Sequence, residues 1–121
     1  MGRHNFKKLK IWEEGMVLVD ETYKMVKNFP DFEKFGLTSQ MTRCAISIPS
    51  NIAEGTSKTS NKHFNNYVEN SFGSAFEYET QLNIAFRQKY LGQENFQVLE
   101  NKIQQLQKML SGFQNGLKRS S

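Results

Sequence analysis

Only two prolines, Pro30 and Pro49, interrupt the 121-residue chain, so long stretches are free to form helices. In four of these stretches apolar residues recur every three or four positions, which is the spacing of one face of an α-helix. No stretch alternates between apolar and polar residues for the length of a strand. Four amphipathic helices joined by short connections predict a single all-α domain over residues 1–121, folded as an antiparallel up-down-up-down four-helix bundle.

The first helix is predicted over residues 6–29, because the residue before Pro30 is disfavoured in the α region. We expect its core-facing stripe to consist of the regularly spaced apolar residues Leu9, Trp12, Met16, Val19, Tyr23 and Val26. Trp12 is interpreted as an anchor of the core. In the connection that follows, Phe32 and Phe35 are expected to cover the end of the core.

The second helix is predicted to begin after Thr38 or Ser39 and to reach Glu54. Gly55 is predicted to stop this helix. Pro49 lies inside it, where proline removes one backbone hydrogen bond and costs about 3 kcal/mol. Glu54 lies in the last turn, where the helix dipole disfavours an anion. Two such departures from local preference in one short segment indicate a site of some kind.

The third helix is predicted from about residue 60 to residue 90, and the fourth over residues 93–112. The termini, residues 1–6 and 114–121, are expected to be flexible.

An antiparallel hairpin of the second and third helices places Ser71–Ala75 beside Arg43–Ala45. Small residues then face small residues, so the two backbones can approach closely. In this register we expect an ion pair between Arg43 and Glu77.

The net charge of +4 and the pI of about 9.2 favour acidic partners such as nucleic acids. The basic excess lies near the termini, since residues 1–10 hold four basic residues and no acid, and residues 118–119 hold two more. The remaining body has ten basic and twelve acidic residues and is nearly neutral. The N-terminal arm either binds phosphates or only keeps the chain in solution, and the sequence leaves both interpretations open.

Cellular location is indicated by two features. The single cysteine, Cys44, cannot form an internal disulfide, which suits a reducing cytoplasm. The first residues lack the apolar core of a signal peptide, and no apolar run is long enough to cross a bilayer. We therefore expect a cytoplasmic protein with no membrane partner.

No catalytic or metal-binding motif with the required spacing occurs in the sequence. A di-metal centre in a four-helix bundle needs Glu-x-x-His pairs, and neither histidine has a glutamate three residues before it. Cys44 lies on an apolar helix face, which favours an inert thiol over a nucleophile. Catalysis would need Glu54, Glu77 or Glu79 to converge with a base in a pocket. We expect a protein that is not an enzyme, with no cofactor, no metal and no small-molecule substrate.

Two groups of polar residues are candidates for recognition. Asn51 and Glu54 share one helix face, with Lys58 and Lys62 across the following turn. This group is either a hydrogen-bonded helix end or a contact site for a subunit or ligand. The candidates for phosphate contacts through counterion release are Arg3, Lys7, Lys8, Lys10, Lys58 and Lys62.

Two sequence blocks resemble a known family. The first is Leu37–Gln40, Arg43 and Ser47–Gly55, which ends in SIPSNIAEG, and the second is Gly73–Leu82, GSAFEYETQL. Together with the early Leu9–Trp12 they resemble the bacterial four-helix-bundle family of intervening-sequence proteins, first recognised as reading frames inserted in large-subunit ribosomal RNA genes. The accessory protein of diversity-generating retroelements is similar in fold.

The resemblance implies a four-helix bundle without established enzymatic activity. The likeness to related family proteins implies assembly into a ring of five protomers. The likeness to the retroelement accessory protein implies nucleic-acid binding. We therefore expect a homo-oligomer, a pentamer, that binds RNA or DNA, and the alternative is a scaffold module with no nucleic-acid role. The residues that the resemblance places at a motif or interface are Arg43, Ser47, Pro49, Asn51, Glu54, Gly55, Ser74, Glu77 and Glu79.

Overall fold

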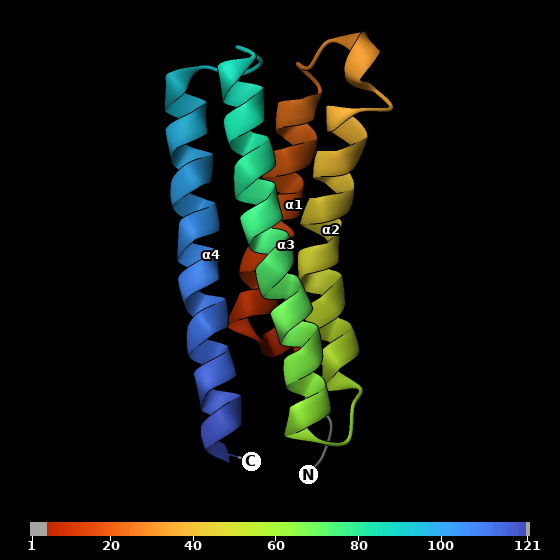
Figure 1. Ribbon diagram of the computed structural model, residues 1–121, viewed down its shortest axis with the longest axis vertical. Helices are drawn as coiled ribbons and strands as arrows, with labels where there is room; N and C mark the ends of the chain where they lie inside the picture. The colour runs from red at the N-terminus through yellow and green to blue at the C-terminus, as the bar shows by residue number, and fades with distance from the viewer. Residues whose placement is uncertain (1–4, 121) are drawn as a thin grey trace.

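The computed structural model describes residues 5–120. Its α-helices are α1 (Lys10–Val26), α2 (Leu37–Thr56), α3 (Asn61–Arg87) and α4 (Gln93–Ser120), and the short 3-10 helices η1 (Phe6–Lys8) and η2 (Asp31–Glu33) precede α1 and α2. Figure 1 shows the four α-helices side by side, with successive helices running in opposite directions. The predicted all-α four-helix bundle is confirmed.

The four helices occupy the corners of a square in chain order. Helices α1 and α3 each pack against α2 and α4. Diagonal helices are farther apart, and the side chains of Tyr78 in α3 and Thr22 in α1 meet across the core between them. The α1–α2 face and the α3–α4 face therefore lie on opposite sides of the bundle. The lower end in Figure 1 holds the α2–α3 connection and the end of α4, and the upper end holds the other two connections.

The core contains one buried polar pair among its apolar side chains. Tyr78 and Thr22 are both fully buried, and their hydroxyl oxygens lie 2.6 Å apart. Thr22 Oγ1 also donates to the Leu18 carbonyl oxygen at 2.7 Å. Because each hydroxyl has a partner, burying these two polar groups leaves no unpaired donor.

The buried face of α1 differs from the predicted stripe. Its buried residues are Ile11, Gly15, Leu18, Thr22 and Met25, and in the predicted stripe Met16 is 38% exposed and Tyr23 is 48% exposed. Trp12, predicted as a core anchor, is half-buried and meets the Phe6 ring edge-on with centroids 5.4 Å apart.

Gly15 explains why the buried face of α1 differs from the predicted stripe. The position that a Cβ of Gly15 would occupy lies 3.4 Å from Pro49 Cβ and 3.5 Å from Ile48 Cγ2. At this separation a small residue must face α2 at position 15, so the neighbouring Met16 lies at the edge of the contact and stays partly exposed.

The α1–α2 connection is held by one carboxylate. Glu33 Oε1 accepts the backbone N–H of Leu37 at 3.0 Å, so α2 begins earlier than predicted. Glu33 Oε2 accepts the hydroxyl of Tyr90 at 2.9 Å, which ties this connection to the end of α3. The prediction that the two phenylalanines cover the core is wrong, because Phe32 is 78% exposed and Phe35 is 88% exposed.

The other helix boundaries also differ from the predictions. The first helix is divided, since Leu9 is extended between η1 and α1, and α1 ends at Val26. Helix α3 ends at Arg87, where Lys89 has a φ of 67° and the Tyr90 N–H donates to the Ala85 carbonyl at 3.0 Å. Helix α4 continues to Ser120 rather than ending at residue 112, with Leu117 buried. Residues 1–4 and 121 lie outside the described residues, and the flexibility of the termini stays a prediction.

Candidate functional site

Small residues line the contact between α2 and α3, as the sequence predicted. Ser47 Oγ lies 2.8 Å from Ser74 Oγ and 2.6 Å from the Cys44 carbonyl oxygen. Ser71 Oγ donates to the Ile48 carbonyl oxygen at 2.9 Å. We call Ser47, Ser71 and Ser74 the serine seam. Its hydroxyls reach the backbone or side chain of the facing helix, so the two helices pack closely without unpaired polar groups.

Gly55 extends this close packing and does not stop α2. The helix continues through Thr56, and no glycine of the described residues has a positive φ. A Cβ at Gly55 would lie 2.7 Å from Phe64 Cδ1 and 3.0 Å from Tyr67 Cβ. Gly55 is therefore the residue that lets the first turns of α3 pack directly against α2, and the predicted role as a helix stop is wrong.

The polar residues of the motif serve mainly internal contacts. Asn51 Nδ2 donates to the Ser47 carbonyl oxygen at 2.8 Å, within its own helix. Arg43 and Glu54 are exposed. The predicted ion pair between Arg43 and Glu77 is wrong, because Cys44 is the α2 residue that faces Glu77, with Sγ 3.4 Å from Glu77 Oε1.

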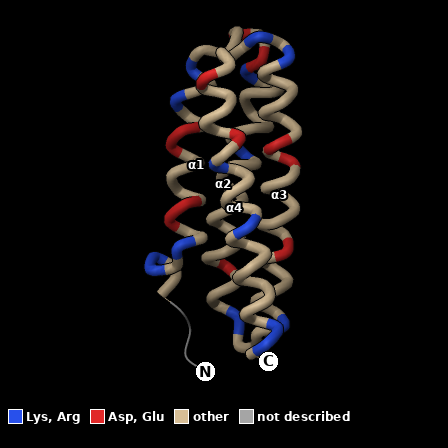
Figure 2. Tube along the Cα trace, turned by 90° about the vertical axis from the view of Figure 1, so that its left-hand side faces the viewer, with Lys and Arg blue, Asp and Glu red and all other residues tan. Residues whose placement is uncertain are grey.

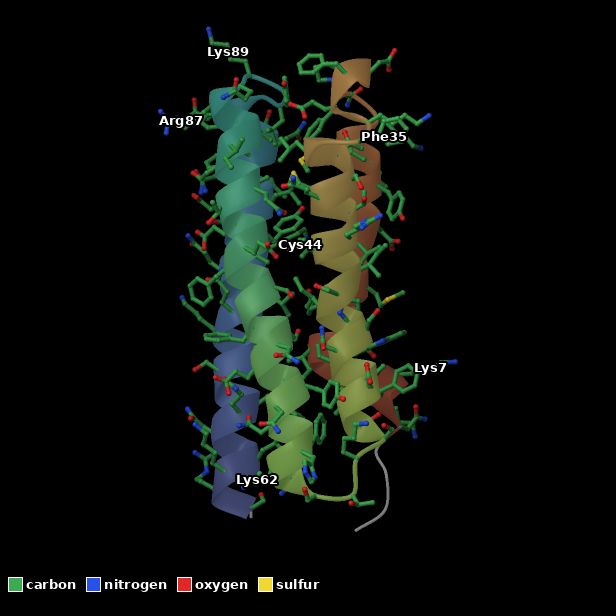
Figure 3. The ribbon with its side chains drawn as sticks, turned by 45° about the vertical axis from the view of Figure 1, so that its right-hand side comes forward. Lys7, Phe35, Cys44, Lys62, Arg87 and Lys89 are labelled. Carbon is green, nitrogen blue, oxygen red and sulfur yellow. The ribbon has the colours of Figure 1, made fainter. Side chains whose placement is uncertain are left out.

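The Cys44 thiol is buried in the contact between α2 and α3 (Figure 3). Its sulfur lies 3.1 Å from the Ser74 carbonyl oxygen. Burial, with the hydrogen bond and charge of Glu77, raises the pKa of Cys44 from 9.0 to about 12. The thiol therefore stays protonated at neutral pH, which is the opposite of what a nucleophile or a thiolate ligand requires.

Glu79 joins α3 to α4. Its Oε1 accepts from Gln107 Nε2 at 2.8 Å, and its Oε2 accepts from Gln104 Nε2 at 3.0 Å. Glu77 and Glu79 thus face different helices, and Glu54 is exposed on α2, so these carboxylates do not converge on one pocket. Within residues 5–120 no three His, Cys, Asp or Glu side chains could together hold a metal ion. No helix of that region is long and apolar enough to cross a membrane.

A shallow apolar groove lies on the outer face of α1 and α2. It measures about 310 Å³ and is lined by Trp12, Met16, Val19, Ile46, Pro49, Ser50 and Ala53. The groove was not predicted from the sequence, although its α1 side is part of the apolar stripe that was assigned to the core. Pro49, Ser50 and Ala53 come from the SIPSNIAEG motif, so one side of the motif forms the serine seam and the other forms the groove.

Basic residues from three parts of the chain lie in the lower half of the bundle, those of the α2–α3 connection and of the end of α4 at its tip and the N-terminal lysines higher on another side. We define the basic end as Lys7, Lys8, Lys10, Lys58, Lys62, Lys118 and Arg119. The stretches that carry them, residues 5–12, 55–68 and 114–120, contain no acid. Figure 2 shows blue segments at the α2–α3 connection and at the end of α4, with no red segment among them. Arg3, also a candidate, lies outside the described residues.

The side chains of the basic end are mostly exposed. Lys58 is the half-buried member, and its Nζ lies 4.9 Å from the centroid of the Tyr67 ring. Figure 3 places Lys7 and Lys62 in the lower half of the bundle and Arg87 and Lys89 at its upper end. The sequence placed the positive excess at the termini, and the antiparallel topology brings the α2–α3 connection to the same end.

The sequence matches the family of 23S rRNA-intervening sequence proteins over residues 7–112. The chain belongs to this family. The match covers both sequence blocks that suggested the resemblance, so that resemblance is confirmed. The family description names no catalytic activity.

One solved structure similar to this intervening-sequence protein is a protein of unknown function from the S23 ribosomal protein family of Bacteroides thetaiotaomicron VPI-5482. The two chains are 22% identical with a TM-score of 0.77, and the alignment covers 86% of this chain and 97% of the other. At this identity the likeness shows the fold alone. The comparison with curated proteins finds no match.

Proposed function

We propose that this intervening-sequence protein is a non-enzymatic, self-associating bundle of the cytoplasm that binds RNA or DNA through phosphates at its basic end. The observation that carries the proposal is that the basic residues of the α2–α3 connection and of the end of α4 lie together at the lower tip, with the N-terminal lysines in the same half of the bundle. A solubilising N-terminal arm is the rival interpretation of residues 1–10. That interpretation gives no reason for Lys62, Lys118 and Arg119 to lie at the same end.

Phosphate binding by such a surface has a measurable signature. Each phosphate contact releases counterions, so the logarithm of affinity falls with the logarithm of salt concentration by about 0.9 per contact on duplex DNA and about 0.7 on single strands. One basic end offers few contacts. Protomers that associate side by side in the same direction would present all their basic ends together, which raises affinity without any new contact.

Two matched triple variants test the proposal. Lys62→Ala, Lys118→Ala and Arg119→Ala remove three charges from the lower end, and Lys34→Ala, Arg87→Ala and Lys89→Ala remove three exposed charges from the upper end. Fluorescence anisotropy with a labelled RNA and a labelled duplex at several salt concentrations measures the slope for each protein.

We expect the lower-end variant to reduce the slope by about two to three, because each of the three removed charges accounts for about 0.7–0.9 of the slope. The upper-end variant should leave the slope unchanged. Deleting residues 1–10 should also weaken binding. If the affinity of the parent protein does not depend on salt, phosphate binding at the basic end is contradicted. The same holds if the two triple variants change the slope equally.

A different observation favours a protein-interaction module with no nucleic-acid role as the second candidate. The α1–α2 groove leaves apolar residues of both helices in contact with solvent, and extended apolar surface on a protein commonly marks an interface. Sedimentation equilibrium of the pure protein tests self-association directly. We expect the mass of several protomers, five if the family resemblance extends to assembly. A single-chain mass at all concentrations would contradict self-association.

A further inference from the structure

The apolar stripe of α1 that was predicted to face the core is only partly covered by the rest of the chain. Its members include Met16 and Tyr23, which are 38% and 48% exposed, and across the groove Ile46 of α2 is 40% exposed. The buried face of α1, in contrast, includes Gly15 and Thr22. Helix α1 therefore carries apolar residues on its core-facing side, such as Leu18, and also on its outer side, such as Met16. Exposed apolar side chains that lie together on two neighbouring helices commonly mark an interface.

The opposite face of the bundle carries an apolar projection. Phe72 and Phe76 of α3 pack edge-on with ring centroids 5.0 Å apart, and Phe76 is 50% exposed. Both lie toward α4, since Ala75 and Glu79 on that side of α3 accept hydrogen bonds from α4. A Cβ at Gly73 would meet no atom within 4 Å, so space is open around the projection. We call Phe72, Gly73 and Phe76 the aromatic ridge.

The groove and the ridge lie at the same height along the bundle. The serine seam pairs Ser47 with Ser74 and Ile48 with Ser71, which sets the ridge level with residues 47–48 of α2. Gly15 of α1 approaches Pro49 and Ile48, which sets the middle of the groove at that level as well. A contact between the two faces therefore requires no shift along the helix axes.

We propose that the α1–α2 groove of one protomer receives the aromatic ridge of a second copy of this chain. The two faces are different and lie on opposite sides of the bundle, so the contact is head-to-tail and each copy can add a further copy. Because groove and ridge are level, successive copies do not rise along the helix axis and stay in one layer. The rotation between neighbouring copies then decides whether that layer closes into a ring. All basic ends lie on one side of the layer. The inference rests on the proposed self-association and assigns the surfaces that form it.

Two single-face variants and their mixture test this assignment. Ile46→Glu places a charge in the groove, and Phe76→Ser removes the exposed part of the ridge. Phe35→Ser is the matched control, because Phe35 is 88% exposed at the upper end and outside both faces. Sedimentation velocity should give the parent mass for the control and a single-chain mass for each face variant.

The mixture of the two face variants distinguishes this arrangement from a symmetric dimer contact. The Phe76→Ser chain keeps its groove and the Ile46→Glu chain keeps its ridge, so one contact remains between them. We expect a complex of two chains and nothing larger. Failure of the mixture to associate would overturn the proposal, as would variants that keep the parent mass.

Two controls keep the outcomes distinct. A parent protein that sediments as a single chain would refute self-association itself, whereas oligomeric face variants would refute only the assigned surfaces. If circular dichroism shows that Phe76→Ser loses helix, Gly73→Glu replaces it, because its side chain enters open space and adds a charge to the ridge. The same masses are expected for that variant.

Discussion

Replacing Gly55 with alanine tests how closely α2 and α3 pack. At an open helical position this change stabilises a protein by about 0.5–1 kcal/mol, because glycine loses more conformational entropy on folding. At Gly55 the added methyl carbon would lie 2.7 Å from Phe64 Cδ1 and 3.0 Å from Tyr67 Cβ. Phe64 is 1% exposed, and its ring packs against Phe113 with centroids 5.4 Å apart. Neither neighbour can move aside without moving α3.

The expected magnitude follows from two opposing effects. Adding a methyl group to a filled core costs about 1–3 kcal/mol. The gain in helix propensity offsets about 0.5–1 kcal/mol of that cost. We therefore expect Gly55→Ala to lower the free energy of unfolding by about 1–2 kcal/mol, which corresponds to a fall in Tm of about 4–8 °C for a chain of this length.

Thermal and urea unfolding, followed by circular dichroism at one protein concentration, measures this change. Gly112→Ala in α4 is the matched control, since its added Cβ meets no atom within 4 Å. The control should gain about 0.5–1 kcal/mol. A Gly55→Ala protein that is as stable as the parent, beside a stabilised control, would refute the close approach of the two helices.

Three further predictions concern single residues. Lys89→Gly should stabilise the protein by about 1 kcal/mol, because Lys89 holds a left-handed φ of 67°; unchanged or lower stability in the same melts would contradict this. Since the pKa of Cys44 is about 12 in the folded protein and 9.0 as its ordinary value, the unfolded thiol ionises first and stability should fall as pH rises from 9 toward 12. Cys44→Ala should weaken this fall in urea titrations, and an identical pH profile would argue against the raised pKa. Tyr78→Phe should cost about 1 kcal/mol by removing the buried hydroxyl pair, whereas Tyr23→Phe, at a half-exposed site, should have no effect.

The fold was predictable because its determinants are local in the sequence. Helical periodicity gives the four helices, and the polar or proline-containing connections give the reversals of direction. The antiparallel register of α2 and α3 then follows from their short connection. That register correctly placed Ser74 beside Cys44.

The errors arise where a local pattern has two tertiary explanations. Periodicity shows that α1 has an apolar stripe, and it does not show whether the core or another molecule covers that stripe. A glycine near a helix end is typical of a stop, but Gly55 serves close packing against residues that lie nine and twelve positions later. The cap of α2 comes from Glu33 in the preceding 3-10 helix, a contact that no capping pattern at Thr38 or Ser39 predicts.

The candidate site was predictable only in its parts. The sequence located the N-terminal basic residues and the two lysines of the α2–α3 connection. The predicted up-down-up-down topology also places the two termini and the α2–α3 connection at one end. What the sequence did not show is that α4 continues to Ser120, which carries Lys118 and Arg119 to that end on a helix. The groove was missed because it is formed by side chains of two helices.

Sedimentation velocity of the pure protein with and without RNA, at low and at high salt, is the decisive test of phosphate recognition by an assembled bundle. We expect an oligomer in the absence of RNA, co-sedimentation with RNA at low salt, and release of the RNA from an intact oligomer at high salt. RNA that stays bound at high salt, or that never binds at low salt, would contradict phosphate recognition by the basic end.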